Sequence, residues 1–363
     1  MGILLILIDF HMNRRIYYLD LLRVFLTMLV FFHHSAIGFG ASGGWYYLSK
    51  ETTTGVTQIL LSLLMGIDQS YFMSLFFFIS ALLMPESLDR KGFRLFLVDR
   101  VKRLLVPLLI FVFILNPLLV YWIYGHWNNF GPGPMWFVFT LLIFESSYLA
   151  YRKWFKKRIV INWKRPSVLG IITFFILAGI FAFSVRLFCP TGKNILGLQL
   201  GYFPLYIFMY ALGIIAGRNG WLERIQVRDS LPWFLIAIFL GIPFFAESVL
   251  YYQNSAGNFA GGWSVQALIY AFWEPVMCAG FSYFLVAIAK KYFDKPCHIM
   301  QTLSADSYAF YIIHPFFVVG FTFLSETLPI VPLVRLFFVL LVGIPVCFGA
   351  AHGLRLVFGK HWL

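Results

Sequence analysis

Arg23 and His34 stand eleven residues apart in the segment YYLDLLRVFLTMLVFFHH, which is otherwise apolar enough to cross a bilayer. Because an α-helix turns about 100° per residue, the two side chains share one helix face, roughly 16 Å apart along the axis. Asp20 lies one turn before Arg23 and can pair with its guanidinium. A neutral imidazole near pH 7 can take a proton from a hydroxyl, so His34 is a candidate general base. The alternative is a snorkelling arginine and a core histidine.

Glu274 is another ionisable residue inside an apolar segment, YAFWEPVMCAG, close to its middle. The proline that follows it removes one helical hydrogen bond and leaves a carbonyl oxygen without its usual partner. A carboxylate at this depth marks a functional site by default, and we expect it to pair with His34 or Arg23 and to orient the imidazole. The alternative is a protonated, structural glutamate. His33 would point about 100° away from His34, so we expect it to matter far less.

Three residues nearer the ends of apolar segments have two interpretations each. Asp68 and Glu247 either contact a substrate or are simply solvated. Trp136 either offers a flat surface for a sugar ring or belongs to the aromatic belt at the membrane boundary. Glu145, in the inner half of the fourth span, is expected to balance an arginine.

The elements that carry these residues are predicted to be membrane helices. Of the 363 residues, 61% are hydrophobic and only 12% charged, whereas soluble proteins are roughly 45–50% apolar and roughly 25% charged. Apolar stretches long enough to span a bilayer recur along the whole chain. We predict an all-α, polytopic integral membrane protein, a single domain over 1–363. Its expected spans are about 16–38, 62–85, 104–124, 135–151, 167–187, 201–217, 231–250, 264–289, 307–324 and 333–357.

The distribution of basic residues predicts the topology of these ten spans. Alternate connections, together with the two terminal segments, hold 23 of the 28 Lys and Arg residues. The remaining connections hold four, and Arg23 lies within a span. Basic residues are retained on the cytoplasmic side, so both termini are predicted to be cytoplasmic. The net charge of +13 therefore has a topological cause, and no nucleic-acid partner is expected.

Neither a metal site nor a signal peptide is indicated. The cysteines are scattered, with no CxxC or Cys/His cluster, at Cys189, Cys278, Cys297 and Cys347. The apolar segment MGILLILIDFH precedes the first arginines, which is the opposite order to a signal peptide. Residues 1–15 either lie along the membrane interface or include residues before a true start at Met12.

Several segments carry a resemblance to a known family. YYLDLLRVFLTMLVFFHH resembles the opening of the acyltransferase family 3 membrane proteins, whose signature is an arginine, ten residues and a histidine, here Arg23 and His34. YFMSLFFFISALLMPESLDRKGFRLFLVDRVKRLLVPLL is similar to the second and third helices, including an Arg-x-x-Arg pair. GPMWFVFTLLIFE resembles the fourth helix and SADSYAFYIIHPFF the ninth, whereas 152–260 match in hydropathy only. The nearest branch is the glucan-modifying, glucans biosynthesis protein C-like one. Ala81 replaces a usual glycine but is still small.

The resemblance implies O-acylation of a cell-envelope carbohydrate in a bacterial plasma membrane, with acyl-CoA as the cytoplasmic donor. Arg100 and Arg103, three residues apart at a cytoplasmic helix start, would hold the coenzyme A phosphates; the alternative is ordinary topology-setting charge. His314 and Tyr311, one turn apart, would line the donor channel or belong to the core. His34 would act as the general base or as a transient acyl carrier. Acetyl is the commonest acyl group implied, and the glucan branch suggests succinyl.

Two other functional classes remain at this stage. A secondary transporter or flippase for an envelope sugar would also have about ten spans, charges near the midplane and helices interrupted by proline. The lack of a visible internal repeat and the Arg/His spacing favour the acyltransferase. A scaffolding subunit of a polysaccharide-export complex is the third class, and it would tolerate the loss of His34. The acyl group, the acceptor and the oligomeric state are left open.

Overall fold

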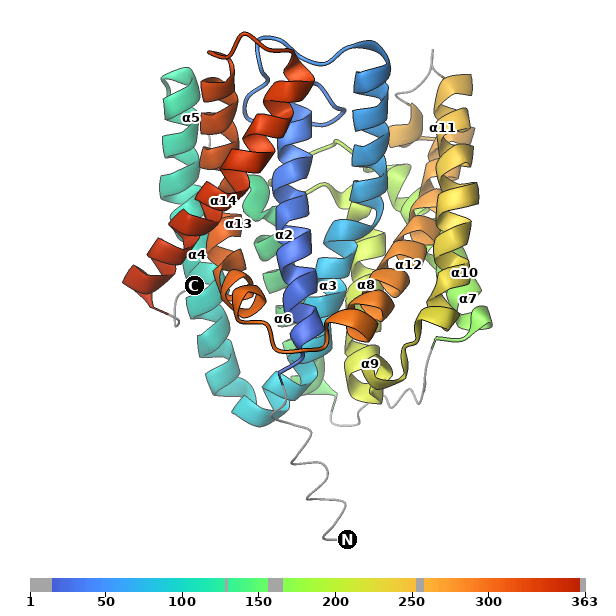
Figure 1. Ribbon diagram of the computed structural model, residues 1–363. Coiled ribbons are helices and arrows are strands. Elements are labelled where there is room, and N and C mark those ends of the chain that lie inside the picture. The colour runs from blue at the N-terminus through green and yellow to red at the C-terminus, as the bar shows by residue number, and fades with distance from the viewer. Residues whose placement is uncertain (1–14, 128–129, 156–165, 253–257, 360–363) are drawn as a thin grey trace, which may run out of the picture.

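The computed structural model describes residues 15–127, 130–155, 166–252 and 258–359, and all of their extended regular elements are helices (Figure 1). Nine helices of these ranges are long and apolar enough to cross a membrane. The prediction of an all-α, polytopic membrane protein is confirmed. The N-terminal segment 1–14, whose role the sequence left open, lies outside the described residues.

The helices follow one another along the chain with short connections. They are α2 (Tyr17–Gly38), α3 (Gly55–Arg100), η1 (Val101–Leu105), α4 (Val106–Ile110), η2 (Phe111–Leu115), α5 (Asn116–Tyr124), η3 (Gly133–Met135), α6 (Trp136–Trp154), α7 (Val168–Arg186), η4 (Leu200–Tyr202), α8 (Phe203–Asn219), α9 (Trp221–Arg224), α10 (Val227–Ile236), η5 (Ala237–Gly241), α11 (Ile242–Tyr251), α12 (Val265–Phe293), α13 (His298–Ser325) and α14 (Pro332–Phe358).

One of the nine membrane helices is a run of 70 residues, Gly55–Tyr124, that folds back on itself. Straight, it would be roughly 105 Å long, more than three times the hydrocarbon thickness of a bilayer. Gly92 breaks it with φ 71° and ψ 166°, a conformation that glycine adopts without a steric penalty. In Figure 1, α3 runs down to the lower end and α4 and α5 return to the upper end. The predicted spans 62–85 and 104–124 are thus two arms of one helical run.

The connection between those two arms, 86–103, is itself helical apart from the break at Gly92. Phe96 of this segment is fully buried, whereas the apolar side chains on either side of it, Leu95 and Leu97, are 66% and 43% exposed. The burial of Phe96 fixes the segment against the rest of the protein.

Three short π-helical segments have a common cause. η1, η2 and η5 each end two residues before a proline, at Pro107, Pro117 and Pro243 respectively. A proline has no N–H and its ring would clash with the carbonyl four residues earlier, so the preceding turn widens. Each helix therefore continues through the proline with a bulge instead of stopping.

Close approach of α3 and α8 joins the two halves of the bundle. A Cβ on Gly213 would lie 2.4 Å from the Phe78 carbonyl oxygen, and one on Gly217 would lie 2.2 Å from that of Leu82. Glycines four residues apart allow backbones to approach closely, which is how membrane helices commonly pack. Ala81 is fully buried at this contact. The expectation that its small side chain preserves close helix contact is confirmed.

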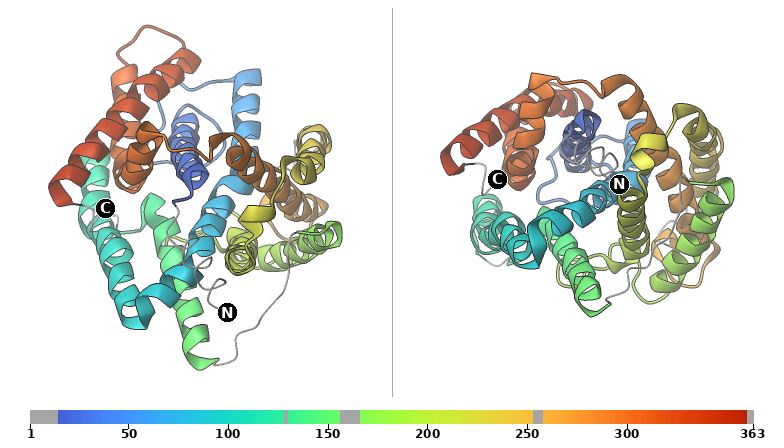
Figure 2. Two further views of the ribbon diagram at one scale, coloured as in Figure 1. Left: turned by 60° about the horizontal axis from the view of Figure 1, so that its bottom comes forward. Right: turned by 90° about the horizontal axis from the view of Figure 1, so that it is seen from below.

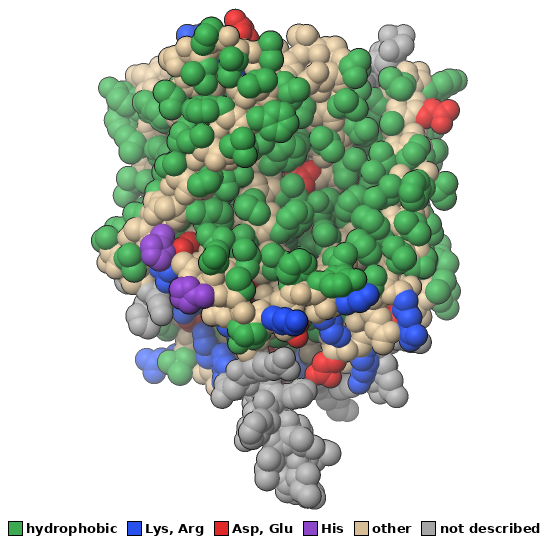
Figure 3. All heavy atoms as spheres, in the orientation of Figure 1, with side chains coloured by type: hydrophobic (Ala, Val, Ile, Leu, Met, Phe, Trp, Pro, Cys, Tyr) green, Lys and Arg blue, Asp and Glu red, His purple; other side chains and the backbone are tan. Residues whose placement is uncertain are grey.

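The surface divides into an apolar belt and one basic end. Hydrophobic side chains cover the middle of the visible face, and Lys and Arg gather along its lower edge (Figure 3). We call this the basic end; α2 begins there and the turn at Gly92 lies there (Figure 1). At the opposite end lies the connection 39–54 between α2 and α3. Seen along the helices, α2 runs inside a ring formed by the others (Figure 2), so its side chains face protein.

Candidate functional site

Two cavities lie one above the other along α2. The first, of about 1210 Å³, is at the basic end and is lined by Arg23 and Thr27 of α2. The second, of about 1680 Å³, opens toward the opposite end and is lined by His33 and His34. Arg23 and His34 therefore share a face of α2, as their spacing predicts, but they belong to different cavities.

A thin layer of side chains separates the two cavities. Met73 of α3 and Tyr311 of α13 line both of them. The Tyr311 hydroxyl donates a hydrogen bond to the carbonyl of Pro134, in the turn that leads into α6. Three separate parts of the chain thus meet at the level where the two cavities adjoin.

We call the first the basic cavity, because arginines from three walls line it. They are Arg15, Arg23, Arg100, Arg103 and Arg355. Each has a carboxylate partner. The nitrogen–oxygen distances are 2.7 Å for Arg15–Asp20, 3.4 Å for Arg23–Asp20, 3.3 Å for Arg100–Glu145 and 3.0 Å for Arg103–Asp99, and Arg355 pairs with Asp306. Five guanidinium groups thus share four carboxylates, which leaves an excess of positive charge.

Two pairings expected from the sequence are present in the basic cavity. Asp20 pairs with Arg23, and the Ser304 hydroxyl donates to the same carboxylate at 2.9 Å. Glu145 balances an arginine, Arg100. Asp20 is buried, so its charge needs the three partners that surround it. It holds Arg23 in place and is absent from the cavity wall.

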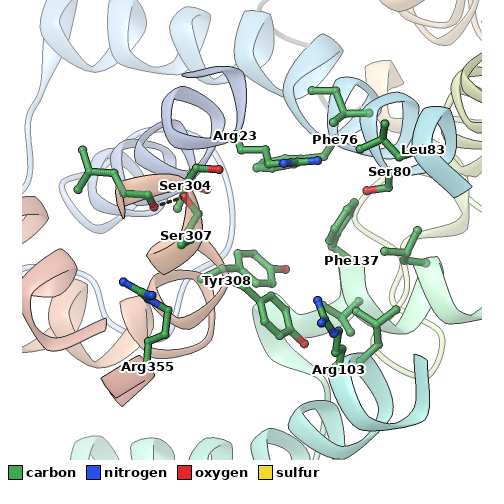
Figure 4. A pocket seen from close by; sticks show the side chains of 18 of the residues that line it. Arg23, Phe76, Ser80, Leu83, Arg103, Phe137, Ser304, Ser307, Tyr308 and Arg355 are labelled. Carbon is green, nitrogen blue, oxygen red and sulfur yellow. Dashed lines mark hydrogen bonds between the residues drawn. The ribbon is translucent and has the colours of Figure 1, made fainter. Parts of the chain in front are cut away.

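Figure 4 shows how the basic cavity is arranged. Arg103 and Arg355 lie on different sides of it, Arg23 lies on a third side, and the Tyr308 ring projects between them. The Tyr308 hydroxyl is buried and has no hydrogen-bond partner among the described residues. Sequence analysis did not single out Arg355 or Tyr308, and Arg355 was counted only as terminal charge. A cavity with spaced guanidinium groups can bind a polyanion with several phosphates.

We call the second cavity the neutral cavity, because no Asp, Glu, Lys or Arg is among the described residues that line it. His33 lies on its wall with Nδ1 2.9 Å from the Oδ2 of Asp68, and its ring stacks on Phe72. With Asp68 ionised, Nδ1 carries the proton that it donates, and Nε2 is the basic nitrogen. Asp68 is 4% exposed and lies behind the wall. The alternative that Asp68 is simply solvated is therefore wrong, whereas a role for it in the site stays a prediction.

His34 has a different environment from its neighbour. Its ring stacks on Trp45 with centroids 3.8 Å apart and on His314 with centroids 5.3 Å apart. Its Nδ1 is buried without a hydrogen-bond partner among the described residues. The imidazole is thus held by flat contacts and keeps its hydrogen-bonding capacity for a ligand.

Glu274 does not approach His34 or Arg23, so the expected pairing is wrong. Its carboxylate pairs with Arg186, and both side chains are at most 1% exposed. Tyr270 lies 4.7 Å from the Arg186 guanidinium, which stacks over its ring. A buried carboxylate needs a buried cation, and this need was the available signal. Arg186 is one of the four basic residues that the charge distribution assigns to the remaining connections, although it lies at the end of the predicted span 167–187.

Three other predicted residues are now placed. His314 is fully buried and lines neither cavity. Its Nδ1 donates a hydrogen bond to the Tyr311 carbonyl at 2.7 Å. His314 is therefore a core residue, and its interpretation as part of a donor channel is wrong. Trp136 lines the neutral cavity and stacks on Tyr206, so it is not a lipid-facing belt residue. Glu247 is exposed and lines neither cavity, because it lies on the outer face of α11.

The connection 39–54 forms part of the site and was missed. Trp45 and Tyr46 line the neutral cavity, and the Tyr46 hydroxyl donates to Asn116 of α5. The connection is tied to α13 through Glu326, which accepts from the Tyr47 hydroxyl at 2.8 Å and the Lys50 N–H at 3.0 Å. Burial and the bond to Glu326 raise the pKa of the Tyr47 phenol to about 12, so it remains a donor at neutral pH. The signal in the sequence that could have pointed to this connection is its aromatic run, GGWYY.

The bundle of membrane helices thus contains a basic cavity and a neutral cavity that adjoin at Met73 and Tyr311. The acyltransferase domain of the acyltransferase 3 family matches residues 16–352. The chain belongs to this family. No curated protein and no solved structure matches the chain. As a membrane-bound acyltransferase it must bring an acyl donor and an acceptor together, and the transporter and scaffold interpretations are not supported. Within the described ranges, no three His, Cys, Asp or Glu side chains are grouped to hold a metal ion.

Proposed function

We propose that the protein is an O-acyltransferase of a bacterial plasma membrane that moves an acetyl or succinyl group from cytoplasmic acyl-CoA to a hydroxyl of a cell-envelope carbohydrate. The observation that carries the proposal is the pair of cavities whose described linings have only Met73 and Tyr311 in common. One cavity is cationic and suits a phosphate-rich donor. The other has no charged residue among its described lining residues, holds His33 and His34, and suits a polyol.

The donor is proposed to enter the basic cavity. Arg100 and Arg103 offer guanidinium forks to its phosphates, and Arg355 on another wall offers a further one. Arg23 lies deeper on α2, and its charge would draw the donor toward the layer at Tyr311. The basic end of the molecule is then the cytoplasmic end, in agreement with the rule that Lys and Arg are retained inside.

His34 is proposed as the general base, since it lines the neutral cavity above that layer. Its imidazole takes the proton of the acceptor hydroxyl while the hydroxyl oxygen bonds to the thioester carbonyl carbon. The carbon–sulfur bond then breaks, and the imidazolium returns the proton to the leaving thiolate. An ester and free coenzyme A result, so the base is regenerated. His33, held by Asp68, would place a second imidazole beside the reacting groups.

Several finer points belong to the same proposal. Both termini are cytoplasmic, because α2 begins at the basic end and α14 runs toward it (Figure 1). Trp136 contacts the carbohydrate. Membership of the glucan-modifying branch is proposed from the motifs quoted above and would favour succinyl. These points are separable from the reaction itself.

Proteoliposomes containing the purified protein and sealed with radiolabelled acetyl-CoA or succinyl-CoA inside would test the reaction. Solubilised envelope glycan would be added outside, and the expected result is label in the glycan and none in glycan added to empty vesicles. Engineered single cysteines would give the orientation: in cells, an impermeant reagent should label position 126 and not position 153. Absence of transfer with either donor would contradict the function, and the reverse labelling pattern would contradict the assignment of the ends.

A further inference from the structure

The neutral cavity differs from the rest of the molecule in its complete lack of ionic side chains along its described wall. Hydrogen-bonding groups there are amides, hydroxyls and imidazoles, including Gln58, Ser62, Gln69, Asn116 and Gln199. Aromatic rings supply much of the remainder, including Trp45, Tyr46, Trp136, Tyr202, Tyr206 and Tyr270. Flat rings pack against the C–H faces of sugar rings, while amides and hydroxyls bond their hydroxyl groups.

The charged residues near this cavity do not line it and form ion pairs or hydrogen bonds with other residues. Glu326 accepts bonds from the connection 39–54, and Arg335 pairs with Glu51 at 3.1 Å. Lys193 lies between two lining residues, but its ammonium donates to the Phe188 carbonyl at 3.3 Å. Arg186 is sealed behind Tyr202 and Tyr270 by its pairing with Glu274. Among the described residues, no Lys or Arg side chain lies on the cavity wall to receive an acidic group from a ligand.

An anionic ligand would therefore lose its hydration without gaining a partner, which is strongly unfavourable in a buried site. A neutral sugar loses only hydroxyl–water bonds, and the amides replace them. The cavity volume of about 1680 Å³ exceeds the roughly 300–1,000 Å³ of ordinary small-molecule pockets. It has room for several consecutive sugar units.

We infer that the acceptor is an uncharged oligosaccharide or polysaccharide segment, bound through stacking on Trp136 and through neutral amides, and that uronic-acid or phosphate-bearing glycans are rejected. This inference rests on the proposed function and narrows its acceptor class. Its evidence is the chemistry of the wall and not the identity of the base.

Binding to the full chain in lipid nanodiscs would test this without any donor. Saturation-transfer NMR would compare neutral glucose oligomers with oligogalacturonides of equal length. We expect the neutral oligomers to bind at least about tenfold more tightly. Trp136→Ala should weaken their binding about two- to tenfold, the usual range for one lost aromatic contact. Trp263→Ala is the matched control, because Trp263 is exposed and lines neither cavity.

A gain-of-charge variant sharpens the test. Gln58 donates to the Gly40 carbonyl at the cavity wall, and a lysine there could make the same bond. Gln58→Lys should raise affinity for oligogalacturonides and leave neutral binding largely unchanged. Equal binding of acidic and neutral oligomers by the unmodified protein, or no binding of either, would overturn the inference. Because the proteoliposome assay uses whole envelope glycan, transfer there without any neutral preference would refute only the acceptor class, whereas no transfer would refute the function.

Discussion

The two cavities of this acyltransferase lie in one helix bundle but differ in where their charged side chains are placed. In the basic cavity every arginine is held by a carboxylate, so the positive charges are positioned before any ligand arrives. At the neutral cavity the carboxylate of Asp68 lies behind the wall and holds an imidazole. Ionic groups therefore orient side chains at both cavities, but charged side chains line only the basic cavity among the described residues.

The largest effect should come from the neutral cavity. His34→Ala should lower acyl transfer about a hundred- to ten-thousandfold, the usual contribution of a general base, while donor binding in the basic cavity is unchanged. His33→Ala should cost about tenfold or less, because its imidazole is not the proposed base. Transfer from radiolabelled acyl-CoA at matched protein levels measures both. A larger loss in the His33 variant would move the base to the His33–Asp68 pair.

The next effect concerns the basic cavity. Arg100→Ala should weaken coenzyme A binding roughly ten- to a hundredfold, as expected for a lost charged hydrogen bond, and Arg103→Ala somewhat less because Arg103 is more exposed. Calorimetry in detergent measures the affinity. Arg228→Ala is a control at a largely exposed arginine outside the cavity.

Removal of Arg100 leaves Glu145 buried and unpaired, so a second variant is needed. Arg100→Ala combined with Glu145→Gln removes both charges and should bind coenzyme A as weakly as Arg100→Ala alone. Recovery of full affinity in the double variant would mean that Arg100 neutralises Glu145 and does not contact the donor. Donor binding in the basic cavity would then depend on its other arginines.

The smallest effect is expected at Asp68. Asp68→Asn keeps the shape of the side chain but removes the charge behind His33, and transfer should fall about two- to tenfold, the range for one net hydrogen bond. Because Asp68 acts through His33, the double variant with His33→Ala should be no worse than His33→Ala alone. Additive losses, measured with the pH dependence of transfer, would show that Asp68 acts independently of His33.

Features that depend on one helix were predictable from the sequence. Apolar length and helical periodicity are local, so the membrane class, the shared face of Arg23 and His34 and the Asp20–Arg23 pair all followed from spacing. Partners on other helices were not predictable in this way. Spacing gives the direction of a side chain around its own axis, but packing decides which neighbour lies there.

The failures illustrate this limit. Glu274 faces Arg186, 88 residues away, and not α2. Asp68 faces His33 and not solvent. The reversal between the spans 62–85 and 104–124 was predicted, but the helical path of their connection, broken at Gly92, was not. Trp45 lies in a connection without periodicity, and its stacking on His34 depends on the whole path of that connection.

The layer at Met73 and Tyr311 has an electrical consequence. A membrane that stores energy as an ion gradient cannot tolerate a continuous water column, and two chambers in series through one protein would be such a column if they joined. Met73 is flexible and can move aside for a narrow acyl arm and then close around it, while the Tyr311 hydroxyl is tethered across the bundle to Pro134. Under the proposed function, the layer would therefore keep the two chambers electrically separate, because an acyl arm that passed Met73 would fill the gap that it opened.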